Sequence, residues 1–387
     1  MKIVAFVYNF TNRKTFVYKI AIKNTSFAQN ISERKRKLIM IKKIVVGIVG
    51  LGMLWSSCSN DIDLIDTKKE IPVVYGLLSR QDTAHYIRIE RAFADNKVSG
   101  LELAKNVDSL YYTDAVAQLI NVKTNKSYTL TKVDGNKEGY KRQTGIFVDS
   151  PNYLYKIKAK DIDLIQNDVF KLVIKRKNGA IITEAQTVIL PDMELLESRT
   201  LVQAGNDKNI NVLGSINLFW QSKNMSSIEF SKIYDIKMLI NITEYPKDGS
   251  PERKVNLEWN MIKGYLPNDT EAFPALGQIT YRERNSNAFY KFLEQNLSGT
   301  KPALRKLENV RLRVDSGGKE LYSYIDVGNV NLGITGTEIA PTYSNINNGY
   351  GILSSRNYFI SRPLQITNNS LDSLISSSLT KKLEFFK

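Results

Sequence analysis

Hydrophobic and polar residues alternate in short segments from residue 71 onward. The segment HYIRIERAF places His85 on the same face of a strand as two isoleucines and turns the residues between them the other way. Further along, Asn178-Gly179 lies between two strand patterns, and this dipeptide is the strongest short signal for a β-hairpin. About seven such strands at regular spacing predict an immunoglobulin-like or fibronectin-III-like β-sandwich over residues 71–192. Pro191 is expected to end its last strand.

Longer alternating segments follow in the second half of the chain. YDIKMLINI at 234–242 and VNLEWNM at 255–261 predict two long strands that are each buried on one side. LYSYIDV at 321–327, which follows a Gly-Gly pair, is expected to be another strand. These patterns are typical of a sheet that faces the core with one side only.

Two segments of the second half have helical spacing. Apolar residues three and four apart predict a helix from about Ser286 to just before Ser298, and a short amphipathic helix is expected over 371–379. The fold class is therefore mainly β, with a second β-rich domain over 193–387 that carries one or two short helices. The patterns leave open whether this half shares a core with the first.

The hydrophobic pattern is different in KKIVVGIVGLGMLWSSC, residues 42–58. Two lysines precede an apolar run, small residues follow it, and the only cysteine of the chain ends it. The run is about a dozen residues long, whereas a membrane-spanning helix needs roughly 20. The segment resembles a bacterial lipoprotein signal with Cys58 as the acylated residue, although Trp55 stands where a leucine is typical. The alternative is that Cys58 is a buried free thiol.

The start of the chain is interpreted in the same way. Met40 would begin a signal peptide of ordinary length, so residues 1–39 are expected to be an over-called start and 40–57 the signal peptide. Residues 58–70 form a polar, acidic tether. Such a run resembles the export signal of surface lipoproteins, and the alternative is a plain hydrophilic linker. The expected location is the outer membrane, lipid-anchored, on its periplasmic or cell-surface side.

Charge and cysteine content narrow the choice of partners. The net charge is +15, but residues 1–57 carry 11 basic residues and one acidic residue, which leaves the rest of the chain near +5. A strongly basic protein favours nucleic acid as a partner. Most of the excess positive charge lies in residues 1–57, so without this leader the charge gives no reason to expect nucleic acid. A single cysteine excludes internal disulfides and thiolate zinc sites.

Candidate catalytic residues are few. A Ser-His-Asp or Cys-His system needs an imidazole, and His85 is the only histidine of the chain and lies in a strand pattern. A structural role is therefore predicted for it, with no metal and no cofactor. A pair of carboxylates for glycoside cleavage stays open, because sequence spacing does not reveal which acids meet in space.

One segment has the composition of a binding site. Residues 343–351, YSNINNGYG, place aromatic rings and amides between glycines, a mixture that suits recognition of protein or glycan surfaces. The candidate binding residues are Tyr343, Asn345, Asn348 and Tyr350. The alternative is that the glycines only let the chain bend and that Tyr350 fills the core.

Several segments together resemble a known family. They are IPVVYGLLSRQDTAHYIRIERAF, DSLYY, FKLVIKRKNGAIITEAQTVILPD and PTYSNINNGYGIL. They are similar to a large family of bacteroidete outer-membrane lipoproteins that share a domain of unknown function and are often encoded beside TonB-dependent receptors. The resemblance spans most of residues 58–360 and implies no catalytic residue.

The expected function is that of a non-enzymatic, lipid-anchored accessory binding component of an outer-membrane uptake or assembly system. Its partners would be the membrane, through Cys58, and a TonB-dependent receptor or a surface glycan, with no nucleic acid. A surface adhesin or matrix component is one alternative, and a glycan-processing enzyme is the other.

Overall fold

The computed structural model describes residues 70–92, 98–204, 207–223, 231–268, 272–273, 278–285, 287–330 and 342–387. The chain divides into the units Met1–Leu64 and Ile65–Lys387, and all described residues belong to the second. The over-called start, the signal peptide, Cys58 and all of the tether except Glu70 therefore lie outside the described residues.

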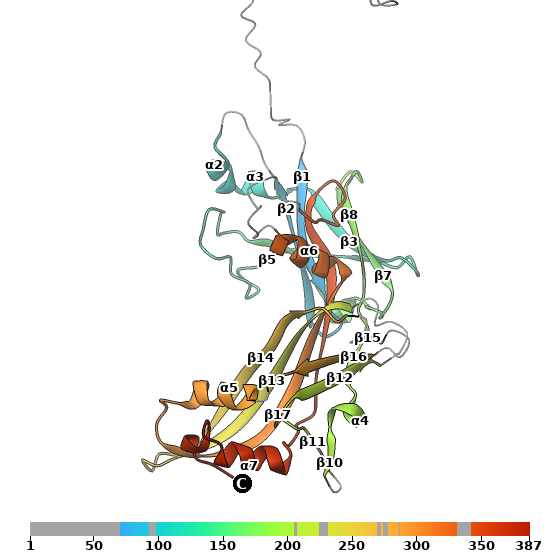
Figure 1. The fold of residues 1–387 in the computed structure, drawn as a ribbon. Helices are drawn as coiled ribbons and strands as arrows, with labels where there is room; N and C mark the ends of the chain where they lie inside the picture. The colour runs from blue at the N-terminus through green and yellow to red at the C-terminus, as the bar shows by residue number, and fades with distance from the viewer. Residues whose placement is uncertain are drawn as a thin grey trace, which may run out of the picture. The chain divides into compact units, whose positions relative to one another are not determined.

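The described residues form mainly β structure, as the alternating patterns predict (Figure 1). The strands of the first half are β1 (Ile71–Leu78), β2 (Ala84–Ala92), β3 (Ala115–Asn121), β4 (Ser127–Thr129), β5 (Thr131–Asp134), β6 (Tyr153–Lys158), β7 (Val169–Arg176) and β8 (Ile181–Val188). Those of the second half are β9 (Met193–Leu195), β10 (Val202–Ala204), β11 (Asp207–Asn209), β12 (Ile216–Ser222), β13 (Ser231–Pro246), β14 (Arg253–Tyr265), β15 (Ala272–Phe273), β16 (Gln278–Glu283), β17 (Ala303–Gly318), β18 (Tyr350–Ile360) and β19 (Phe385–Phe386). The helices are α2 (Gly100–Ala104), α3 (Val107–Leu110), α4 (Glu197–Thr200), α5 (Ala288–Leu297), α6 (Lys319–Val330) and α7 (Asn368–Ser376), with 3-10 turns at Ala159–Asp161 and Lys381–Leu383.

The first core lies between two sheets. Strands β18, β1, β2, β6 and β5 are neighbours in one sheet, and β4, β3, β7 and β8 form the other. Alternate residues of both sheets point inward, and Val74, Ile87, Leu119 and Leu172 are almost fully buried there. The predicted hairpin at Asn178-Gly179 joins β7 to β8, with Gly179 at φ 90°.

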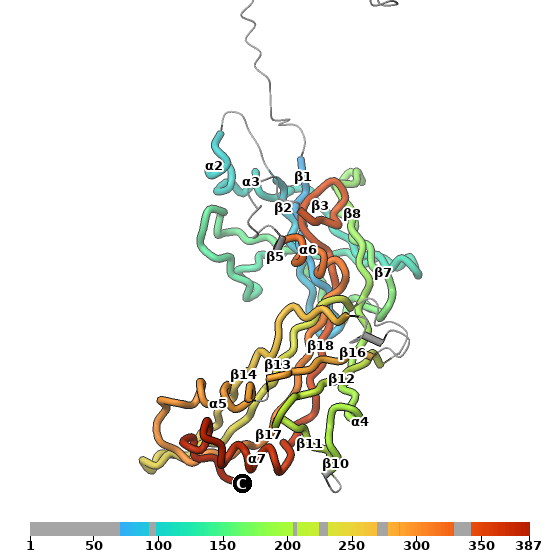
Figure 2. Tube along the Cα trace, in the orientation of Figure 1, coloured from blue at the N-terminus to red at the C-terminus, as the bar shows by residue number. Residues whose placement is uncertain are grey.

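Strand β18 belongs to both halves of the described structure (Figure 2). It runs parallel to β1 from the Val73–Tyr350 pair to the Leu78–Ser355 pair. It then pairs antiparallel with β17, from Gly317–Arg356 to Arg313–Ile360. Residues 71–192 therefore do not contain every strand of the first sheet, and one sheet continues through both halves while each half keeps its own core.

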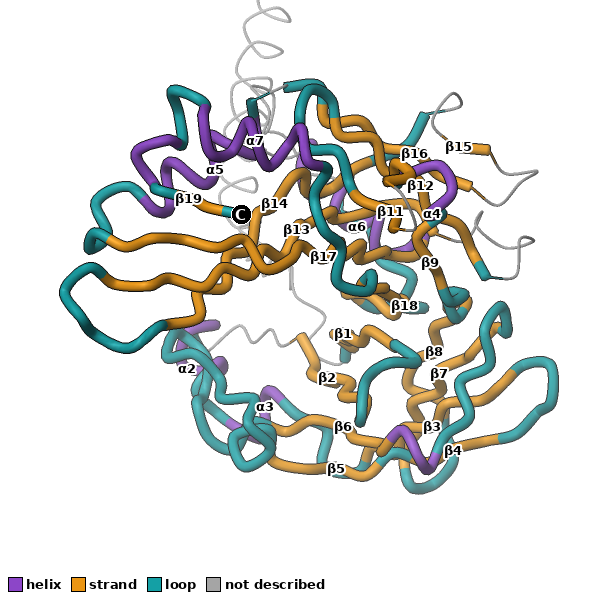
Figure 3. Tube along the Cα trace, turned by 90° about the horizontal axis from the view of Figure 1, so that it is seen from below, coloured by secondary structure: helices purple, strands orange, loops and turns teal. Residues whose placement is uncertain are grey.

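The second core lies around the long strands β13, β14 and β17. Trp220, Tyr234 and Met238 are buried in it, and helices α5 and α7 lie together on one side of these strands (Figure 3). The predicted helix near Ser286 is α5, which ends at Leu297. The predicted C-terminal helix is α7, which begins three residues earlier than the apolar pattern indicates.

The prediction of a strand at 321–327 is wrong. Strand β17 continues through Gly317 and Gly318, and α6 begins at Lys319. A Cβ atom on Gly317 would lie 2.7 Å from Cδ2 of Leu321, so the glycine lets this helical residue pack directly on the strand. The helix also packs on β13 and β18, where the N–H of Leu321 donates to Oγ of Ser354 at 3.2 Å. These contacts with distant strands outweigh the local preference of the aromatic and β-branched residues for a strand.

Candidate functional site

The predicted binding segment covers the edge of β8. The side chain of Asn345 donates to the carbonyl oxygens of Gln186 at 3.0 Å and Leu353 at 2.7 Å, and it accepts from the N–H of Leu353 at 2.9 Å. The backbone N–H of Asn347 donates to the carbonyl of Glu184 at 2.9 Å. Asn345 is therefore a structural residue that closes an exposed sheet edge.

The four candidate residues of this segment differ in exposure. Tyr343 and Asn345 are half-buried, whereas Asn348 and Tyr350 are exposed. Ile346, between them, points into the first core. Of the four candidate residues, only Asn348 and Tyr350 are exposed enough to contact a partner.

The two glycines of the segment approach β1 closely. A Cβ on Gly349 would lie 2.5 Å from the carbonyl oxygen of Pro72, and one on Gly351, at φ +104°, would lie 2.0 Å from that of Val74. Only glycine allows this backbone approach. The interpretation that Tyr350 fills the core is wrong, because its side chain is 50% exposed.

Tyr350 shares a face of the first sheet with other exposed residues. Its register partner is Val73, so Tyr75 and Leu77 of β1 point to the same side as Tyr350. Tyr324 of α6 packs edge-on against Tyr75, with ring centroids 6.3 Å apart. Burial raises the pKa of Tyr75 to about 12, so its phenol stays protonated at neutral pH. We call Tyr75, Leu77, Tyr324 and Tyr350 the tyrosine face.

A second surface lies further along β18, and the sequence did not indicate it. Arg356 lines two hollows, one of about 620 Å³ and one of about 290 Å³. The larger is bordered by the β1–β2 turn and by residues Glu138, Gly139 and Tyr140, and the smaller by β13, β17 and α6. We call the two hollows together the Arg356 groove.

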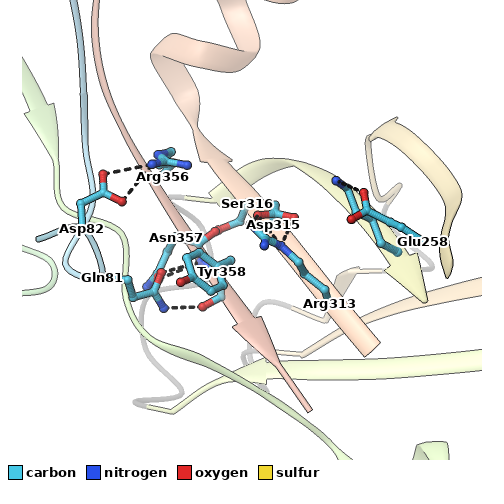
Figure 4. A network of polar contacts seen from close by, with 10 residues as sticks. Gln81, Asp82, Glu258, Arg313, Asp315, Ser316, Arg356, Asn357 and Tyr358 are labelled. Atoms are coloured by element: carbon cyan, nitrogen blue, oxygen red, sulfur yellow. Dashed lines mark hydrogen bonds and ion pairs between the residues drawn. The ribbon is translucent and has the colours of Figure 1, made fainter. Parts of the chain in front are cut away.

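The larger hollow combines aromatic rings with paired charges. Nη2 of Arg356 contacts both carboxylate oxygens of Asp82, at 2.9 and 3.0 Å (Figure 4). The rings of Tyr86 and Tyr140 lie 4.5 Å apart. The hydroxyl of Tyr86 donates to Glu138 at 3.0 Å. Hydrogen bonds from Lys156 and then from Tyr86 lower the pKa of Glu138, so this carboxylate stays ionised.

The smaller hollow repeats this combination. Arg313 donates to both oxygens of Asp315, and its guanidinium lies over the ring of Tyr358 at 4.4 Å (Figure 4). Lys237 contacts Glu258 at 2.7 Å. Both hollows therefore present planar polar groups beside tyrosine rings, with acids and bases in pairs.

His85 lies on β2, as predicted, and is 2% exposed. Its Nδ1 atom is buried without a hydrogen-bond partner among the described residues. Burial lowers its pKa; the nearby Asp82 raises the pKa by a smaller amount, and Arg356 lowers it further. The imidazole is thus neutral and packed in the core, which is a structural position.

Two further observations concern the described part of the chain only. It contains no group of three or more His, Cys, Asp or Glu side chains that could hold a metal ion. Its helices are all too short or too polar to cross a membrane.

No protein-family model and no curated protein matches the sequence. Among solved structures, the chain is similar to the FN1–FN3 domains of chicken CNTN1 at 10% identity, over 74% of this chain and 66% of that chain, with a TM-score of 0.17. It is also similar to the calcium-binding domain CBD12 of CALX1.1 at 8% identity, over 76% of this chain and 99% of that chain, with a TM-score of 0.18. At these scores neither likeness carries an argument about fold or function.

Proposed function

We propose that this protein is a non-enzymatic, lipid-anchored envelope protein that serves as an accessory binding component of an outer-membrane uptake or assembly system. Cys58 would carry the lipid, and the tyrosine face would bind a membrane protein such as a TonB-dependent receptor. The core position of His85, the only imidazole, supports the non-enzymatic part of the proposal.

The observation that carries the proposal is the position of the tyrosine face relative to the tether. Tyr350 pairs with Val73, only three residues after Glu70, so the exposed ring lies at the end of β1 where the tether enters the sheet. The segment from Cys58 to Glu70 can span at most roughly 40 Å when fully extended. A face at this end of the fold would stay within reach of the membrane, where a membrane-embedded partner lies.

The anchor is tested by Cys58→Ala in the full chain. The variant should lose fatty-acid labelling and leave the membrane fraction, because no other cysteine can take its place. Unchanged labelling would contradict the lipoprotein assignment.

The partner is tested by co-purification from detergent-solubilised membranes. Truncation of an aromatic anchor weakens binding by about 2 kcal/mol, roughly 30-fold, so Tyr350→Ala should reduce the yield of a stoichiometric membrane protein. The melting temperature of the Tyr350→Ala variant should equal that of the parent protein, because the side chain is half exposed. Tyr140→Ala is the matched control, since it removes a tyrosine of similar exposure outside the face. Retention of whole cells or glycans by the tyrosine face, with no membrane protein, would favour the adhesin alternative.

A further inference from the structure

The Arg356 groove contains a flat aromatic surface that is held in place. Tyr140 is 53% exposed, and its ring rests against that of Tyr86. The side-chain amide of Asn152, which is fully buried, donates to the carbonyl of Tyr140 at 2.8 Å, and the N–H of Tyr140 donates to the carbonyl of Gly135 at 2.8 Å. A ligand that packs on this ring would therefore find it already positioned.

The groups around the ring can both donate and accept hydrogen bonds. Arg356 has five N–H donors. Its hydrogen bonds to the described residues are both made by Nη2, to Asp82, so the other nitrogens can donate to a ligand. Glu138 lines the hollow and accepts its described hydrogen bonds at Oε2, from Tyr86 and Lys156, so Oε1 has no described hydrogen bond and can accept one. Hydroxyl groups, which donate one hydrogen bond and accept two, fit such a mixed lining.

The charges of the groove are matched. Asp82 pairs with Arg356, Glu138 with Lys156, and Asp315 with Arg313. An anionic ligand would meet these acids and a cationic ligand would meet these bases, so either would be disfavoured by like charges at close range. The lining favours a ligand that is polar but uncharged.

A peptide is a poor fit for the same place. Extended peptides usually bind by adding a strand to an exposed sheet edge. Here β1 leaves β18 after Ser355, and the side chain of Gln81 already bonds both backbone groups of Tyr358 on that edge, so an added strand would have to displace it.

We propose that the Arg356 groove binds a neutral oligosaccharide, with one sugar ring packed on Tyr140 and its hydroxyls bonded to Arg356, Asp82 and Glu138. The C–H face of a sugar is apolar and its rim is polar, which matches a tyrosine ring surrounded by paired charges. The larger hollow, of about 620 Å³, lies within the roughly 300–1,000 Å³ usual for small-ligand sites.

This site goes beyond the proposed function and is centred on residues other than those of the tyrosine face. Arg356 lies six residues beyond Tyr350 along β18, roughly 20 Å at the rise of a strand. Sugar binding at the groove does not require the lipid anchor or a membrane partner, so the two proposals can fail independently.

The test uses the full chain in detergent and five neutral probes, namely maltohexaose, cellohexaose, laminarihexaose, xylohexaose and mannohexaose. Titration calorimetry should detect at least one of them with a Kd below about 1 mM. Tyr140→Ala should weaken that binding at least tenfold, and Tyr140→Phe should keep most of it because the ring remains. Tyr350→Ala, the matched control, should bind the sugar as the parent protein does.

Three results would overturn the assignment. The first is the absence of binding by all five probes at about 1 mM. The second is binding that survives Tyr140→Ala but is lost in Tyr350→Ala, which would place the sugar on the tyrosine face. The third is tighter binding of a charged hexasaccharide such as hexagalacturonate with strong dependence on salt, which would show that the groove selects anions.

Discussion

Gln81 binds both backbone groups of Tyr358 with a single side chain. Its Oε1 accepts the N–H of Tyr358 at 3.0 Å, and its Nε2 donates to the carbonyl of the same residue. This carboxamide takes the place of a neighbouring strand at the point where β18 has left β1 and pairs with β17. The turn between β1 and β2 is thereby tied to the last part of β18 (Figure 4).

Gln81→Ala should reduce the free energy of unfolding by about 1 kcal/mol, because two hydrogen bonds are lost at a partly exposed site. Urea denaturation measures the loss. Gln295→Ala, on the exposed side of α5, is the control and should change stability by less than about 0.5 kcal/mol. Equal stability of the two variants would show that the Gln81 contact does not hold β18.

Gly351→Ala should reduce the free energy of unfolding more than Gln81→Ala does. The residue has φ +104°, and an added Cβ would lie 2.0 Å from the carbonyl oxygen of Val74, so β18 would have to move away from β1. A loss of at least about 2 kcal/mol is expected from strain and overlap together. Gly145→Ala, where no atom lies within 4 Å of the new Cβ, is the matched control. A denaturation midpoint like that of the control would contradict the close pairing of β1 with β18.

The ion pair of Arg305 and Glu244 is buried in the second half. Their side chains are 4% and 1% exposed, and the contact is 2.7 Å. Arg305→Ala leaves the buried carboxylate with only the half-exposed Arg253 as a partner and should cost about 3 kcal/mol in thermal or urea unfolding. Lys306→Ala, which removes a 3.9 Å surface pair with Glu308, should cost under about 0.5 kcal/mol. Similar losses of stability in both variants would mean that the buried ion pair contributes no more to the free energy of unfolding than an exposed ion pair.

His85 should make the folded protein sensitive to acid. Burial lowers its pKa in the folded state, whereas the unfolded chain binds a proton near the ordinary value of 6.5. The stability is therefore complete above that value and is lost as the pH falls below it, at up to about 1.4 kcal/mol per pH unit. Denaturation midpoints measured between about pH 8 and pH 5 should fall less steeply in His85→Gln than in the parent.

Parallel pH curves for the two proteins would show that His85 titrates alike in the folded and unfolded states. The same variant also tests the non-enzymatic proposal. Loss of any hydrolytic activity on this single change would contradict it, because the substitution removes the only imidazole.

Local sequence patterns were enough to predict many elements of the fold. The alternation around His85 predicted β2, and Asn178-Gly179 predicted the turn between β7 and β8. Both are decided by neighbouring residues, through the two-residue period of a strand and the positive φ that glycine allows. The same reasoning failed for α6, because this helix packs on β13 and β18, which lie far from it in the sequence.

Composition indicated only part of the candidate sites. It singled out Tyr350, which is exposed, but it also singled out Asn345, whose amide is used to close the edge of β8. An asparagine that satisfies a sheet edge and one that awaits a ligand look alike in a sequence. The Arg356 groove left no signal, since Tyr140, Asp82 and Arg356 come from three distant segments.

The sequence by itself determined the mainly β class, the hairpin at Asn178-Gly179 and the places of helices α5 and α7, since these depend on contacts a few residues apart. Only the tertiary structure decided that β18 joins β1 and β17, and that Gln81 meets Tyr358 across 277 positions of the chain. Strand pairing of this kind depends on backbone hydrogen bonds, which every residue except proline can make, so the partners carry no matching pattern. The groove at Arg356 follows from that pairing.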